Sequence, residues 1–171
     1  MDKLLIIVDM QNDFIDGALA NPAAQAIVAP MAEYIKKFNG DITFTRDTHS
    51  QDYLKSQEGK NLPIEHCIRG TDGWNIREEL WHVPEHGSIR VVDKESFGDI
   101  SQLKTAIDET TKEILICGTC TDICVVSVAL NLKAAFPEMP ITCLESLCAG
   151  LSPEKHAAAI EVMKSCQVNV I

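Results

Sequence analysis

Short apolar runs rich in branched residues recur along the chain and alternate with longer segments of helical periodicity. The expected strands are Leu4–Val8, Ile42–Thr45, Ile89–Val92, Ile114–Cys117, Ile141–Leu144 and Val168–Ile171. The expected helices are Ala24–Phe38, Asn75–Trp81, Ser101–Glu109, Asp122–Ala135 and Pro153–Lys164. The strands lack polar alternation, which is typical of strands buried on both faces. The pattern predicts an α/β fold: a doubly wound, mainly parallel six-stranded sheet with helices on both faces.

The length of 171 residues suits a single domain covering 1–171, and no repeat or linker interrupts it. The formal net charge of -10 makes nucleic acid an unexpected partner, because an acidic surface repels phosphate. No apolar run reaches the ~20 residues that a membrane span needs, and the N-terminal segment lacks a signal-peptide cleavage site. We therefore expect a cytoplasmic protein without membrane attachment.

The chain has seven cysteines, an odd number that cannot all pair. A reducing cytoplasm would keep them as thiols, and most are expected to be small buried apolar residues. Cys117 and Cys120 have the spacing of a metal or redox pair, but no second pair of this kind accompanies them. A non-catalytic thiol protein, acting in redox sensing or binding, stays open as an alternative.

Polar residues follow several of the expected strands, namely Asp9, Asp47 with His49, Lys94, and the segment leading to Cys124. The carboxyl ends of parallel strands meet at one edge, where open α/β sheets bind ligands. Singly, each residue could cap a turn or lie in solvent. Together, a cysteine at a helix N-terminus, a lysine that favours thiolate and a carboxylate that accepts its proton indicate an activated nucleophile.

Three motifs in chain order carry a resemblance to a known family. The segment from Ile6 to Phe14, IIVDMQNDF, resembles the N-terminal signature of the isochorismatase-like cysteine hydrolases. Residues Gly118 to Val125, GTCTDICV, resemble the segment that carries their nucleophile, and Lys94 follows a strand as the family lysine does. The resemblance covers nearly the whole chain.

The resemblance implies a role for each catalytic residue. Cys124 would attack an amide carbonyl and form a thioester, and Asp9 would take the thiol proton and pass it to the leaving ammonia. Lys94 would keep both groups charged. A cis peptide would join Thr119 to Cys120, and the backbone N–H groups of Cys120 and Cys124 would form the oxyanion hole.

The polar loop from Asp47 to Asn75 resembles the metal-binding loop of the nicotinamidase branch. The ends match through Asp47-Thr48-His49 and through His66, which is followed by Cys67 and Gly70-Thr71. No histidine lies between His49 and His66, so Glu58 is the expected further ligand, with Asp52 and Glu65 as competitors. Two histidines and two carboxylates suit Zn²⁺ best, although Fe²⁺ or Mn²⁺ would also accept them.

Substrate-pocket residues are expected at Phe14, Leu62 and Trp74. The resemblance implies a metal-dependent nicotinamidase that converts nicotinamide and water to nicotinate and ammonia in NAD salvage, with a small-molecule amide as its partner and a homo-oligomer as a further expectation. The main alternative is a metal-independent cysteine amidase of the same family, acting on a carbamoyl, ureido or other small amide.

Overall fold

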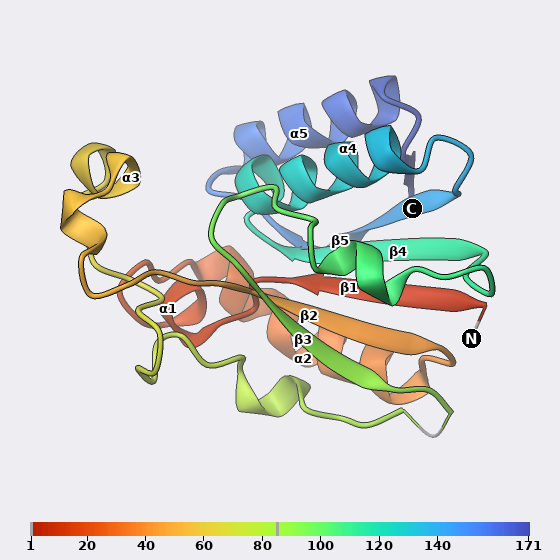
Figure 1. The fold of residues 1–171 in the computed structure, drawn as a ribbon, viewed down its shortest axis with the longest axis horizontal. Coiled ribbons are helices and arrows are strands. Elements are labelled where there is room, and N and C mark those ends of the chain that lie inside the picture. The colour runs from red at the N-terminus through yellow and green to blue at the C-terminus, as the bar shows by residue number, and fades with distance from the viewer. Residues whose placement is uncertain (1, 85) are drawn as a thin grey trace.

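The computed structural model describes residues 2–84 and 86–171 and is built on one six-stranded sheet, shown in Figure 1. The strands are β1 (Lys3–Val8), β2 (Asp41–Asp47), β3 (Ile89–Lys94), β4 (Glu113–Thr119), β5 (Ile141–Ala149) and β6 (Asn169–Val170). Their order is β3-β2-β1-β4-β5-β6, and every neighbouring pair is parallel. The expected α/β fold is confirmed, and the sheet is fully rather than mainly parallel.

Helices cover both faces of the sheet, and a shorter one projects beyond its edge (Figure 1). They are α1 (Asn12–Ile15), α2 (Pro22–Lys37), α3 (Gln57–Asn61), α4 (Val126–Ala135) and α5 (Pro153–Ser165). In Figure 1, α4 and α5 lie together on one side of the strands and α2 lies on the other, as right-handed crossovers in opposite directions from the centre require. The central strands are buried on both faces, with Leu5, Ile6 and Ile116 fully inaccessible, which explains their lack of polar alternation.

Two expected helices are corrected. Ser101–Glu109 contains only a 3-10 turn at Leu103–Ala106, without a side-chain cap at its start. Asn75–Trp81 contains only a 3-10 turn at Glu78–Leu80. The backbone before this second turn is already bonded elsewhere: the Asn75 carbonyl accepts from Asn12, and the Arg77 N–H donates to Met10. These bonds to another segment replace the bonds that a helix would make within itself.

The strand order reverses between β1 and β4, and this is the position where open α/β sheets bind ligands. Val8 pairs with Gly118 at the carboxyl ends of these two strands, and Asp47 pairs with Lys94 at the ends of β2 and β3. The segment carrying α3 projects from the same edge, at the left of Figure 1. No helix among the described residues is both long enough and apolar enough to cross a bilayer.

A substitution at Gly118 can test the close approach of β4 to β1. It has φ +123°, and an added Cβ would overlap the carbonyl oxygen of Val8. We expect Gly118→Ala to lower the free energy of unfolding by about 2–4 kcal/mol, because backbone strain and a clash act together. Gly70 is the matched control: it has φ +86° with nothing within 4 Å of the added Cβ, so Gly70→Ala should cost about 1 kcal/mol. Equal losses in urea unfolding would contradict the close approach.

Candidate active site

Lys94 lies at the centre of the residues expected to be catalytic. Its side chain is 1% exposed, and its Nζ is 2.7 Å from Asp9 Oδ2 and 3.5 Å from Asp47 Oδ1. The same Nζ lies 3.5 Å from Cys124 Sγ. Residues from β1, β2, β3 and the turn after β4 therefore meet around one buried ammonium group.

Asp9 is fixed in its place by the neighbouring strand β2. It has φ 50° and leaves the extended path of β1, a conformation that is unfavourable for a residue with a Cβ. The Thr45 hydroxyl accepts a hydrogen bond from the Asp9 N–H at 3.2 Å and donates one to Asp9 Oδ1 at 2.6 Å. One carboxylate oxygen thus binds Thr45, and the other faces Lys94.

The protonation states follow from burial and from these contacts. Burial, reinforced by the Asp9 carboxylate, raises the pKa of Cys124 well above its ordinary value, and Lys94 opposes this without overcoming it. Burial also raises the pKa of Asp9, again against the attraction of Lys94. The pKa of Lys94 is raised despite burial, because Asp9 and Cys124 favour its charged form. Burial therefore favours the thiol form of Cys124, whereas the lysine and the helix N-terminus led us to expect that the thiolate is favoured.

The turn after β4 presents Cys124. A cis peptide joins Thr119 to Cys120, as the resemblance implied. Residues Thr121–Val125 form a π-helical turn before α4, in which the Val125 N–H donates to the Cys120 carbonyl. Cys120 and Cys124 both line the cavity described below. The assignment of their N–H groups to an oxyanion hole stays a prediction.

Four side chains beside this centre form a cluster suited to a metal ion. One ligand atom from each of Asp47, His49, Glu58 and His66 lies within 4.8 Å of the other three. The His49 and His66 Nε2 atoms are 2.9 and 3.5 Å from Asp47 Oδ2, and both are 3.7 Å from Glu58 Oε1. Two atoms bound tetrahedrally or octahedrally at zinc distances are about 2.9–3.4 Å apart. The separations of 2.9–3.7 Å in the cluster are at or slightly above this range, so small side-chain shifts would bring the four atoms into one coordination shell.

Charge and tautomer also fit a divalent cation. Asp9, Asp47 and Glu58 offer three carboxylates to the single ammonium of Lys94. The two negative charges in excess equal the charge of one divalent ion. His66 Nδ1 lies 2.8 Å from the Ile64 carbonyl, and a proton held there leaves Nε2 free as a ligand. The residues present therefore fit the expected group.

The structure separates Glu58 from its two competitors as a ligand. The side chain of Glu58 begins in the first turn of α3 and reaches the two histidines. Asp52 is instead paired with Lys55 at 2.6 Å on the surface. Glu65 is exposed, and neither competitor belongs to the cluster found among the described residues.

Two buried residues that the sequence reasoning missed support the metal ligands. The Gln11 side chain accepts from the Asp47 N–H at 2.7 Å and donates to the Asp47 carbonyl at 2.9 Å. The Tyr53 ring lies 4.7 Å from that of His49 and 5.0 Å from that of His66, measured between centroids. Gln11 lies within the N-terminal motif, which could have marked it as a functional residue. The sequence does not reveal that its partner is the backbone of Asp47.

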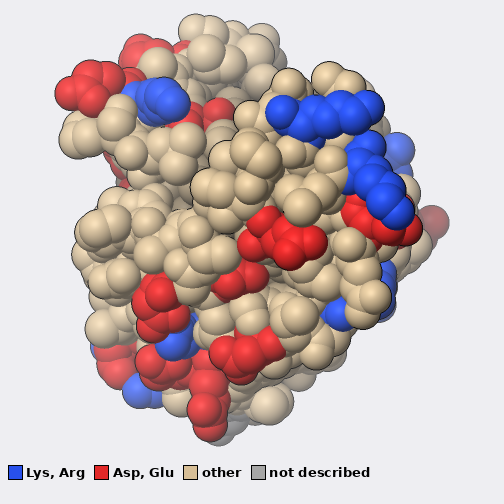
Figure 2. All heavy atoms as spheres, turned by 90° about the vertical axis from the view of Figure 1, so that its left-hand side faces the viewer, with Lys and Arg blue, Asp and Glu red and all other residues tan. Residues whose placement is uncertain are grey.

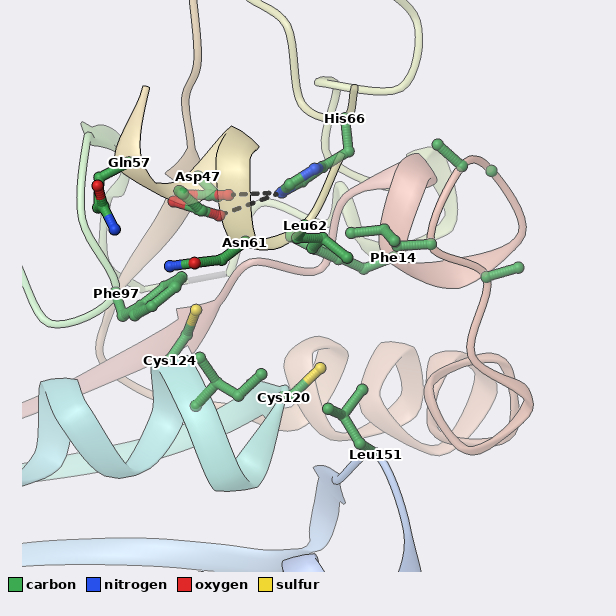
Figure 3. Close-up of a pocket in the computed structure, with 16 residues that line it drawn as sticks. Phe14, Asp47, Gln57, Asn61, Leu62, His66, Phe97, Cys120, Cys124 and Leu151 are labelled. Atoms are coloured by element: carbon green, nitrogen blue, oxygen red, sulfur yellow. Dashed lines mark ion pairs between the residues drawn. The ribbon is translucent and has the colours of Figure 1, made fainter. Parts of the chain in front are cut away.

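A cavity of about 990 Å³ opens beside Cys124 and the cluster of Asp47, His49, Glu58 and His66. Figure 3 shows Cys124, Asp47 and His66 facing into it, with Phe14 and Leu62 on one wall. Phe97 and Ile123 also line it, and the sequence reasoning missed both. Figure 2 shows that this side of the molecule is hollowed beside the projecting segment that carries α3, and that most of the surface there is uncharged.

Trp74 is not among the described residues that line this cavity, so its expected role as a pocket wall is corrected. The Arg46 guanidinium lies 3.5 Å from the centroid of its ring, and the indole N–H donates to the Thr48 hydroxyl at 2.8 Å. The Trp74 carbonyl accepts from Gln11. These contacts hold Trp74 against Arg46 and Thr48, at the end of β2.

Sheet order, the buried Asp9–Lys94–Cys124 centre and the neighbouring cavity are the features expected of a hydrolase that has an α/β fold and a cysteine nucleophile. The chain matches the Isochorismatase domain over residues 3–171 and belongs to that family. It is 26% identical to a nicotinamidase of Saccharomyces cerevisiae, with 99% of each chain covered. It is 24% identical to the nicotinamidase/pyrazinamidase of Mycobacterium tuberculosis, with 99% of this chain and 98% of the relative covered.

Solved structures agree with this family membership. The pyrazinamidase of Pyrococcus horikoshii in complex with zinc superimposes with a TM-score of 0.79 at 30% identity, covering 100% of this chain and 99% of that one. An N-carbamoylsarcosine amidase from Thermoplasma acidophilum shares the fold at a TM-score of 0.74 and 22% identity, covering 99% and 95%. The chain is thus an isochorismatase-family hydrolase that resembles nicotinamidases.

Metal binding can be measured directly. We expect protein purified without chelator to carry about one equivalent of a transition metal, and stripped protein to gain thermal stability when Zn²⁺ is added. His66→Ala should lose most of this gain, because it removes a ligand atom. His86→Ala, an exposed histidine outside the cluster, should behave as the wild type. Less than about a tenth of an equivalent of metal in the untreated protein would contradict the site.

Proposed function

We propose that the protein is a metal-dependent nicotinamidase that hydrolyses nicotinamide to nicotinate and ammonia. The observation that carries this proposal is the position of the Asp47–His49–Glu58–His66 cluster, because three of its residues, Asp47, Glu58 and His66, line the same cavity as Cys124. A pyridinecarboxamide has two groups to be held, a ring nitrogen with a free lone pair and an amide carbon. A divalent ion at the cluster, with zinc as the first candidate, would supply a Lewis acid for the ring nitrogen.

The remaining chemistry belongs to the chain's own residues. Cys124 Sγ attacks the amide carbon while its proton passes to Asp9, and the backbone N–H groups of Cys120 and Cys124 receive the developing oxyanion. Asp9 then protonates the nitrogen, the carbon–nitrogen bond breaks and ammonia leaves a thioester. Asp9 next removes a proton from water, which attacks the thioester, releases the acid and restores the Cys124 thiol. Lys94 stays charged throughout and stabilises Asp9.

The runner-up is a metal-independent amidase of the same family that acts on a carbamoyl or ureido compound. The same catalytic centre would serve it, and the fold is shared with an N-carbamoylsarcosine amidase. A non-catalytic thiol protein is less well supported, because the Asp9, Lys94 and Cys124 contacts are all present.

The catalytic assignment predicts a clear effect for two variants. We expect Cys124→Ala to release no ammonia from nicotinamide, since the thioester cannot form. Asp9→Asn keeps a side chain that can bind Thr45 but removes the base, and should lower kcat by about 10²–10⁴-fold. Circular dichroism should show an unchanged fold for both. Wild-type rates from either folded variant would exclude the mechanism.

The metal requirement distinguishes the two amidase hypotheses. We expect His49→Ala to lower kcat/KM for nicotinamide by at least about 10–100-fold. Loss of a group that only supports a metal ligand already has an effect of this size. Steady-state ammonia release before and after chelation gives the comparison. A His49→Ala variant that turns over a ureido amide at the wild-type rate would favour the metal-independent amidase.

A further inference from the structure

The cavity is much larger than the reaction requires. Its volume of about 990 Å³ falls at the upper end of the range of about 300–1,000 Å³ typical of pockets for drug-sized ligands. A pyridinecarboxamide is a single ring with one small substituent. Once its ring nitrogen and carbonyl are held between the metal cluster and Cys124, most of the cavity is still available.

The available space has an apolar end. The lining there includes Leu19, Ala20, Leu62 and Leu151. Figure 3 shows Leu62 above and Leu151 below the space that extends from Cys124 past Cys120. The Asn21 side chain donates to the Gly150 carbonyl at 3.1 Å, which fastens the loop after α1 to the loop that carries Leu151. We call the surface of Leu19, Leu62 and Leu151 the leucine subsite.

The chemistry of this surface selects an apolar group. Leu151 is 52% exposed although it faces the cavity, so a ligand group that covers it removes apolar surface from water. Among the described lining residues there is no lysine or arginine, while Asp47 and Glu58 are acidic. A carboxylate on the substituent would therefore find no cationic side chain among the described lining residues.

We propose that the leucine subsite binds an apolar substituent on the ring of a heteroaromatic carboxamide, so that ring-substituted amides are better substrates than nicotinamide. The proposal rests on the nicotinamidase function for the placement of the ring. The substituent belongs on ring carbon 5, since this carbon is adjacent to neither the nitrogen nor the carbon that bears the carboxamide. An alkyl group there is directed away from both held groups and toward the open part of the cavity.

The test compares three amides with the zinc-loaded protein: nicotinamide, 5-propylnicotinamide and 5-carboxymethylnicotinamide. We expect kcat/KM for the propyl amide to exceed that for nicotinamide by at least about tenfold, because even one methylene in an apolar pocket is worth roughly that factor. The carboxymethyl amide should fall below nicotinamide. A propyl amide that is hydrolysed no better than nicotinamide would overturn the subsite and leave the nicotinamidase function intact.

Two variants assign the preference to the named surface. Leu151→Ser should reduce the propyl-to-nicotinamide ratio of kcat/KM by at least about fivefold, since it removes apolar contact with the substituent. Val162→Ser, a change at a comparably exposed apolar residue on α5 (47% exposed), should leave that ratio unchanged. An unaltered ratio in Leu151→Ser would also overturn the proposal.

A binding measurement keeps the two proposals separable. Titration calorimetry with zinc-loaded Cys124→Ala should show a Kd for the propyl amide at least about tenfold below that for nicotinamide. If the wild type hydrolyses neither amide, the nicotinamidase function fails, and this affinity ratio alone decides the subsite. Equal affinities, or no binding of either amide, would overturn the subsite as well.

Discussion

The buried ammonium of Lys94 is the contact on which the arrangement of the site depends. Lys94 ends β3, yet its Nζ reaches Asp9 at the end of β1, two strands away, and passes Asp47 at the end of β2. A charge 1% exposed is stable only if its partners replace the hydration that it loses. Asp9, Asp47 and Cys124 do this from three different elements. One side chain therefore connects the proposed catalytic residues with the candidate metal site, and removing it would leave uncompensated carboxylates in both.

The excess of carboxylate charge in the site favours binding of a cation and of a neutral amide, and release of an anionic product. A divalent ion at the cluster would balance Asp9, Asp47 and Glu58 against Lys94, which makes the buried charges tolerable together. A neutral amide adds no charge to that balance. The acid formed by hydrolysis adds one negative charge in a cavity with no lysine or arginine among its described lining residues. Electrostatics thus favour entry of the amide and departure of the product, a direction that suits turnover.

The sequence predicted the features that depend on local pattern and failed where long-range contacts decide. Six strands could be placed because uninterrupted branched apolar runs have few other stable environments than a buried parallel sheet, and the polar residues after them had to share one edge. The roles of Thr45 and Gln11 could not be predicted, because each depends on which strand lies alongside. The same cause accounts for Asn75–Trp81, whose backbone bonds to the segment after β1, and for Trp74, which packs on Arg46. Glu58 was found by position along the chain, and the cluster supplies the geometry that position alone lacked.

The protonation of Cys124 shows why sequence neighbours alone do not determine the pKa of a side chain. A cysteine before a helix and near a lysine suggests a thiolate, but Cys124 lies inside a π-helical turn, is 5% exposed and is affected by the charge of Asp9 as well as by that of Lys94. In so dry a setting the carboxylate opposes a second negative charge as strongly as the ammonium favours it, and burial decides for the thiol. Lys94 also acts on Asp9, where its charge opposes the rise in pKa that burial causes. In the proposed mechanism, Asp9 accepts the thiol proton only when the amide carbonyl arrives to take the sulfur's electrons. On this proposal the thiolate forms in contact with the substrate and is not stored beforehand.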